Sequence, residues 1–202
     1  MLNLLNSLAV SFDLPILDWI QANMQSGFMD FIMPIITILG DAGIFWMICA
    51  TVLLIFPKHR TSGLGMWFAM ALGLVVCNMI LKPLVGRIRP YDFQIQELGK
   101  TWSDFLVHGK LLIDGLSDYS FPSGHTIASF EACTALMLGS KKLGIPATIL
   151  AILIAFSRLY LYVHYPTDVI CSIFLGILFG FIGYYAATKV KLPQFKRGKY
   201  QA

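Results

Sequence analysis

Charge is scarce in this sequence, and its scarcity excludes an ordinary soluble domain. Only 13% of the 202 residues are charged, 57% are hydrophobic, and the mean hydropathy is +0.71. A single soluble core of this size does not need so much apolar surface. The composition therefore predicts an all-α integral membrane protein, a bundle of helices embedded in the bilayer.

Closely spaced cysteines and metal-ligand patterns are missing as well. The four cysteines, which are Cys49, Cys77, Cys133 and Cys171, all fall inside apolar runs. We expect them to be free and buried, because their spacing supports neither a disulfide framework nor a zinc site. The sequence also lacks internal repeats and low-complexity tracts, so residues 1–202 are predicted to form one domain.

Uncharged runs predict where the chain crosses the membrane. Three runs reach spanning length, and two shorter runs fit a span within a bundle. The count is then five, and a sixth span over residues 28–39 is an alternative that the sequence leaves open. The long runs are 61–81, 143–157 and 169–188, of which the second reaches spanning length when it is extended to residue 164. The short runs are 42–56 and 126–140.

Basic residues occur in alternate loops, and this pattern predicts the orientation. The loops at 58–60 and 141–142 and the tail at 190–202 fall on one face of the predicted bundle. By the positive-inside rule this face and the C-terminus are cytoplasmic. Residues 82–125 and the turn at 164–168 then lie on the extracytoplasmic side. The net charge of +4 is expected to favour contact with anionic membrane lipids, and no nucleic acid is expected as a partner.

Residues 1–40 carry acidic but no basic side chains, and the first basic residue of the chain is Lys58. No positive charge therefore holds this segment on the cytoplasmic side, and we place it outside. Two apolar stretches in it, 14–22 and 28–39, are predicted to form interfacial helices. Residues 41–189 would then form the bundle itself.

Several cations are predicted to meet at the outer end of the bundle. An ionisable side chain at bilayer depth costs on the order of 3 kcal/mol, so each needs an interior partner or a function. Lys82, Arg89 and Arg158 all follow apolar runs that end on this side. Ser123 and Gly124 begin a helix there, whose free amide groups and dipole favour an anion. Three cations around such amides suit a tetrahedral dianion, which predicts a phosphoryl group as the ligand.

Two histidines at the same end predict chemistry on that group. His164 has Asp168 four positions later, and the carboxylate would accept a hydrogen bond from Nδ1 and leave Nε2 free to attack phosphorus. His125 follows the helix start and would protonate the departing oxygen as a general acid. His59 and His108 lie in polar surroundings and are expected to make hydrogen bonds only.

Three further features have more than one interpretation. Arg87 is expected to contact lipid headgroups rather than the phosphoryl ligand. Glu131 is expected to be an interior carboxyl, and the alternative is a partner for one of the site cations. The segment 91–121 is long for a plain connection, so it is either a flap that governs entry of a lipid tail or a surface cover.

These stretches resemble the signature of the type 2 phosphatidic acid phosphatase superfamily, which also includes the vanadium haloperoxidases. Every signature position matches, and three motifs at this spacing are far more specific than any one of them. The haloperoxidases are soluble, and the composition argues against that branch. The motifs are Lys82, six residues, Arg89 and Pro90; Pro122 to His125; and Ser157, Arg158, five residues, His164, three residues and Asp168.

The resemblance implies a helical-bundle lipid phosphatase that uses no metal or other cofactor. It implies a phosphohistidine intermediate on His164, oriented by Asp168, with His125 assisting departure of the leaving group. The phosphoryl oxygens would be held by Lys82, Arg89, Ser123, Gly124 and Arg158.

The substrate is predicted to place its phosphate in the pocket and leave its tail in the membrane. Similar proteins act on isoprenyl diphosphates such as undecaprenyl diphosphate, on phosphatidic acid and on phosphatidylglycerol phosphate. The small size and the stretch SRLYLYVHYPTDV favour the isoprenyl diphosphate. An alternative of another class is a protein that binds or transports lipid phosphates without cleaving them. The two histidines argue against it, because such a protein needs no imidazole backed by a carboxylate.

Overall fold

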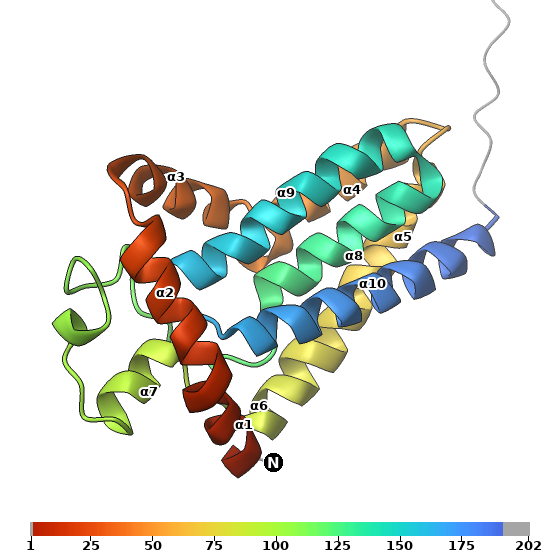
Figure 1. Ribbon diagram of the computed structural model, residues 1–202. Helices are drawn as coiled ribbons and strands as arrows, with labels where there is room; N and C mark the ends of the chain where they lie inside the picture. The colour runs from red at the N-terminus through yellow and green to blue at the C-terminus, as the bar shows by residue number, and fades with distance from the viewer. Residues whose placement is uncertain (1, 192–202) are drawn as a thin grey trace, which may run out of the picture.

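The computed structural model describes residues 2–191, which form a bundle of long helices with shorter helices and loops packed across one end (Figure 1). No strand occurs in this range, so the predicted all-α class is confirmed. The long helices are α4 (Ile44–Ile55), α5 (Arg60–Gly73) with its continuation η3 (Leu74–Leu81) and α6 (Lys82–Val85), α8 (Gly124–Gly139), α9 (Lys141–Tyr160) and α10 (Pro166–Thr188). The elements at the end are α1 (Leu2–Leu8), η1 (Ala9–Asp13), α2 (Leu14–Met24), α3 (Gly27–Ile38), η2 (Asp41–Gly43), α7 (Pro90–Gln96) and η4 (Trp102–Asp104).

Helix α8 lies at the centre of the bundle, and its residues 129–136 are all buried. It packs against α5, α9 and α10. Glycines make these contacts close: a Cβ on Gly176 of α10 would lie 2.7 Å from Cβ of Phe130, and one on Gly144 of α9 would lie 2.4 Å from Cα of Met137. Small residues at helix contacts let the backbones approach. Helix α8 is therefore held firmly relative to its neighbours.

Within residues 2–191, three stretches are long and apolar enough to cross a membrane, namely Arg60–Gln96, Lys141–Tyr160 and Pro166–Thr188. The count is four if α3 and the following η2–α4, which are bent by 42° at the break, form one span. Helix α4 has 12 residues and α8 has 16, fewer than the roughly 20 that an independent span needs. The chain thus has membrane-spanning helices, while the count of five to six stays a prediction.

The outward faces of the long helices are apolar. Ile149 of α9 and Phe174 of α10 are 57% and 70% exposed, as expected for side chains that contact lipid tails. The same outward exposure corrects one expectation about the free cysteines. Cys77 and Cys133 are buried and Cys49 is half-buried, but Cys171 is exposed because it faces away from the bundle. The basic tail beyond residue 191 lies outside the described residues.

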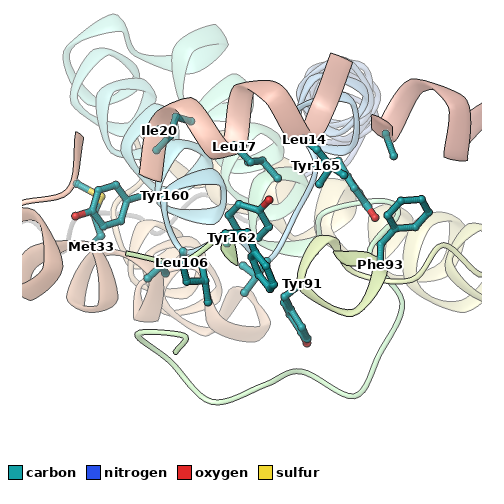
Figure 2. Close-up of a cluster of buried hydrophobic side chains, with 14 residues drawn as sticks. Leu14, Leu17, Ile20, Met33, Tyr91, Phe93, Leu106, Tyr160, Tyr162 and Tyr165 are labelled. Atoms are coloured by element: carbon teal, nitrogen blue, oxygen red, sulfur yellow. The ribbon is translucent and has the colours of Figure 1, made fainter. Parts of the chain in front are cut away.

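A separate apolar cluster joins the N-terminal helices to the turn between α9 and α10. Figure 2 shows Leu14 and Leu17 of α2 close to Tyr162 and Tyr165 of that turn. A hydrogen bond adds to the contact, since the Tyr162 hydroxyl donates to Oδ1 of Asp18 at 2.5 Å. The segment predicted to be interfacial is therefore packed directly onto the loops at the end of the bundle.

Candidate functional site

A cavity of about 430 Å³ lies at this end of the bundle, lined by parts of η2, α5, η3, α8 and the turn after α9. It brings together side chains from three distant parts of the sequence, as the motifs predict. The predicted site residues that line it are Lys82, Arg89, Gly124, His125, Arg158 and His164.

The turn after α6 places Arg89 in the cavity wall. Gly86 ends α6 with a φ of 60°, in the left-handed region that glycine adopts without strain. The chain then presents Arg89, which is 2% exposed. Its guanidinium donates to the backbone oxygens of Asp118 at 2.9 Å and Val163 at 2.7 Å. These bonds hold it in the cavity wall beside Lys82.

The start of α8 presents backbone amides to the cavity. Among the described residues no side chain caps its first turn, so the amides from Gly124 onward are available to an anion. Ser123 lies behind this surface and is fully buried. Its amide donates to Oγ of Ser172 at 2.8 Å, and its Oγ accepts from Thr126 at 2.9 Å. Contact between Ser123 and a phosphate therefore stays a prediction.

Arg158 at the end of α9 is 1% exposed and lines the cavity. Its Nη1 donates to Oγ1 of Thr37 at 2.5 Å, whereas Nε and Nη2 have no partner among residues 2–191. A buried donor without a partner costs about 1–3 kcal/mol. Two such donors at a cavity wall fit the oxygens of a bound oxyanion.

His164 follows α9 in a tight turn, in which Tyr162 has a left-handed φ of 61°. Its Nε2 lies 3.3 Å from Nη1 of Arg89, at the cavity. Burial, together with the positive charges of Arg89 and Arg158, holds the pKa of His164 well below its usual value. The imidazole is therefore neutral at pH 7, and a neutral ring can offer a lone pair as a nucleophile.

Asp168 lies behind His164, but the expected direct hydrogen bond is wrong. Nδ1 of His164 and Oδ2 of Asp168 are 3.8 Å apart, beyond hydrogen-bond reach. Ser120 lies between them, with its Oγ 3.4 Å from Nδ1 and donating to Oδ2 at 2.5 Å. The carboxylate also accepts from Arg87 at 2.5 Å and from the Tyr165 amide at 3.2 Å. Its oxygens are already engaged, so its link to the imidazole passes through a hydroxyl.

Arg87 is not at the lipid headgroups, and that expectation is also wrong. It is 1% exposed and lies between two buried carboxylates. Nη1 donates to Asp168, and Nη2 donates to Oδ2 of Asp13 at 2.7 Å. The guanidinium also stacks on Tyr165, 3.6 Å from the ring centroid. A lone buried carboxylate is costly, which explains why the cation is drawn inward.

His125 lines the cavity from the first turn of α8, and its side chain is 17% exposed. Its Nε2 lies 2.7 Å from Oδ1 of Asp41 and 3.2 Å from Nη1 of Arg158. Nε2 of the predicted general acid therefore lies within hydrogen-bond distance of an acceptor, Asp41, and of a permanent donor, Arg158.

Sequence reasoning missed Asp118, four residues before the second motif. Its carboxylate pairs with Lys82 and, at 2.5 Å, with Nη2 of Arg89. Partial burial acts to raise the pKa of Asp118, but the hydrogen bonds from Lys82 and Arg89 outweigh it and lower that pKa to about 2. The carboxylate is thus ionised at neutral pH and occupies two of the cations that a phosphoryl group would use.

The inner part of the cavity is largely apolar. Glu131 is the exception; it is 1% exposed, and its Oε1 has no hydrogen-bond partner within residues 2–191. This matches the interior position that we expected and not contact with a site cation. A groove of about 400 Å³ on α4 and α5 shares Met47 and Trp67 with the cavity. The groove, which is lined by apolar side chains and Thr51, therefore adjoins the cavity at these two residues.

The remaining histidines do not line the cavity. His59 precedes α5 at the other end of the bundle, and Nε2 of His108 lies 2.9 Å from Oδ2 of Asp30. Within the part of the chain that the structure describes, no group of three or more His, Cys, Asp or Glu is placed to hold a metal ion.

The N-terminal carboxylates are the other residues that sequence reasoning missed. Asp13, Asp18, Asp30 and Asp41 are the only charged residues among the first 57. Their isolation in an apolar segment was a usable signal, because an ionisable group there needs a partner. Ser120, in contrast, carries no signal in the sequence that sets it apart from other serines.

Known proteins are similar to this chain in sequence and in the arrangement of the helices. The sequence profile of the PAP2 superfamily matches residues 62–191. An undecaprenyl-diphosphatase from Sulfolobus acidocaldarius is 32% identical over 68% of this chain and 61% of its own length. The undecaprenyl-diphosphatase BcrC from Bacillus subtilis is 38% identical over 35% of this chain and 37% of its own length. The chain thus matches less than two thirds of the length of either relative.

A solved structure has a similar fold. The PAP2-type phosphatidylglycerolphosphate phosphatase from Bacillus subtilis superposes with a TM-score of 0.65 at 25% sequence identity. The superposition covers 87% of this chain and 85% of that one.

Proposed function

The chain belongs to the PAP2 superfamily, and from that premise we propose that it is an integral membrane phosphatase acting on a lipid phosphate monoester or diphosphate. One observation carries the proposal. The neutral Nε2 of His164 lies 3.3 Å from Arg89, in a cavity that Lys82, Arg158 and the start of α8 also line. A nucleophile beside a binding site for a tetrahedral dianion is what phosphoryl transfer requires.

The proposed reaction has two steps. The phosphoryl oxygens bind to Lys82, Arg89, Arg158 and the amides from Gly124 onward at the start of α8. Nε2 of His164 attacks phosphorus, and the bond to the leaving oxygen breaks as His125 gives that oxygen its proton. Water then attacks the phosphohistidine and returns a proton to His125, and inorganic phosphate leaves. Asp168 acts through Ser120 to hold the tautomer of His164 in which Nε2 is free.

For the substrate we propose an isoprenyl diphosphate such as undecaprenyl diphosphate. The apolar groove that adjoins the cavity at Met47 and Trp67 suits a long hydrocarbon chain that stays in lipid while its phosphates reach the cations. Two relatives named undecaprenyl-diphosphatase support this choice. Phosphatidic acid and phosphatidylglycerol phosphate are the alternatives, and the second is supported by the similar solved structure.

The test is release of inorganic phosphate by the detergent-solubilised protein from a panel of these three lipids. Parent protein is expected to act on at least one of them, with the isoprenyl diphosphate turned over fastest. His164→Ala is expected to lower phosphate release by roughly a thousandfold or more, because no other group replaces the nucleophile. It should keep lipid phosphate binding, because the cations remain.

Equal turnover in His164→Ala and the parent would refute the enzymatic mechanism and favour a protein that only binds or transports lipid phosphates. The same assay with a chelator is expected to give an unchanged rate, since lysine and arginine supply the positive charge at the site. Loss of activity with the chelator would point to a different mechanism.

A further inference from the structure

The N-terminal segment contacts the site at several points, although the PAP2 profile begins only at residue 62. Asp13 accepts from Arg87, which in turn holds Asp168. Thr37 accepts from Arg158 at 2.5 Å, and Asp41 lies against His125. The segment therefore contacts His125, the predicted general acid, and is linked through Arg87 and Asp168 to the predicted nucleophile His164.

The contact with His125 is the most specific of these. Asp41 begins η2, the break between α3 and α4, and its side chain caps no helix. Gly40 lies against the face of the same imidazole, where a Cβ would stand 2.7 Å from Cδ2. The backbone of Gly40 thus packs on the ring, and the carboxylate of Asp41 faces its Nε2 at 2.7 Å.

Positive charge otherwise dominates the surroundings of this ring. Arg158 lies 3.2 Å from Nε2, and the cations Arg89 and Lys82 also line the cavity. Like charges disfavour a proton on an imidazole, and a nearby carboxylate favours it. Asp118 is already paired with Lys82 and Arg89. Burial and the neighbouring cations lower the pKa of His125 well below its usual value, and Asp41, 2.7 Å from Nε2, is the carboxylate placed to oppose that shift.

We propose that Asp41 is a positioning residue for the general acid, a carboxylate beside Nε2 of His125 that favours the protonated ring until the leaving oxygen takes the proton from Nε2. This role depends on the function proposed above. As the P–O bond breaks, the proton moves from Nε2 to the leaving oxygen, and the ring becomes neutral. Water that hydrolyses the phosphohistidine on His164 returns a proton to Nε2 of His125.

Asp41→Asn tests the proposal, because the change keeps the shape of the side chain and removes its charge. General-acid help matters for a poor leaving group and not for a good one. We expect kcat/KM for a short-chain phosphatidic acid, which releases an alcohol, to fall on the order of tenfold, and that for 4-nitrophenyl phosphate to change less than about twofold. The decline of kcat/KM for phosphatidic acid at high pH should also begin at a lower pH in Asp41→Asn, because the imidazolium loses its proton more readily.

His125→Ala should give the same selectivity for leaving group with a larger loss. His108→Gln is the matched control, since it breaks another aspartate–histidine contact, that with Asp30, away from the cavity. It should leave both rates unchanged. Equal losses of Asp41→Asn on the two substrates, or no loss on either, would overturn the proposal. A parent protein without turnover on either substrate or on the isoprenyl diphosphate would instead overturn the proposed function.

Discussion

Asp168 makes hydrogen bonds to three donors, and none of them is the imidazole that it was expected to orient. The reason is local charge balance. A fully buried carboxylate needs strong donors, and Arg87 and Ser120 supply them. Ser120 then faces Nδ1 of His164 at 3.4 Å. The motif spacing brings His164 and Asp168 close together. Ser120 and Arg87, which the motif does not contain, complete their hydrogen bonds.

Arg158 is the cation whose substitution tests the oxyanion site most directly. Two of its nitrogens lack a partner among the described residues, while a third donates to Thr37. Lysine supplies one nitrogen and cannot form a planar fork. We expect Arg158→Lys to lower kcat/KM by roughly ten- to a hundredfold, because at least one charge-assisted hydrogen bond of about 1.5–3 kcal/mol is lost.

The measurement is phosphate release at several substrate concentrations. Arg60→Lys, at the other end of the bundle, is the control and should keep its activity. An unchanged rate in Arg158→Lys would remove this arginine from the site.

Among the elements, α5 and α10 show how the bundle is held together. Gly183 of α10 faces the backbone of α5, where a Cβ would lie 2.5 Å from both the Gly65 oxygen and the Ala69 nitrogen. Backbone atoms cannot move aside as a flexible side chain can. The two helices approach as closely as glycine permits, and van der Waals contact at this distance stabilises helix pairs in membranes.

Gly183→Ala is therefore expected to destabilise the protein by roughly 2 kcal/mol, in the range for overpacking a tight contact. Thermal unfolding in detergent measures the effect as a lower midpoint. Gly27→Ala is the matched control, because a Cβ there meets no atom within 4 Å. The packing argument fails if both variants unfold at the same temperature as the parent.

For the whole molecule, the site lies at the end of the bundle opposite the loops at 58–60 and 141–142. Figure 1 shows the N-terminal helices and α7 at that same end. Because the basic loops are proposed to be cytoplasmic, the cavity is proposed to face outward. Substrate would then be hydrolysed on the extracytoplasmic surface.

Single cysteines test this orientation. Lys110→Cys in the loop after η4 and Lys142→Cys at the start of α9 both place a thiol at an exposed position. In intact cells a maleimide that cannot cross membranes is expected to label Lys110→Cys and not Lys142→Cys. Parent protein, with its four native cysteines, sets the background. The reverse labelling would contradict the proposed topology.

The sequence alone determined the helical class, the membrane setting and most of the cavity. Hydropathy depends only on composition along the chain, and the motif residues are separated by fixed numbers of residues. Motif spacing and predicted topology therefore sufficed to place Lys82, Arg89, Gly124, Arg158 and both motif histidines at one site. The number of spans could not be fixed in this way, because α4 and α8 are short and α8 is enclosed by other helices.

Only the tertiary structure decided which residues complete the site. Asp13 lies 74 positions from its partner Arg87, Asp41 lies 84 positions from His125, and Asp118 lies 29 positions from Arg89. No periodicity in the sequence encodes such contacts, since they depend on how the N-terminal helices pack across the end of the bundle. Arg87 shows the same limit: its charge suggested a surface position, and two buried carboxylates supplied by the fold drew it inside.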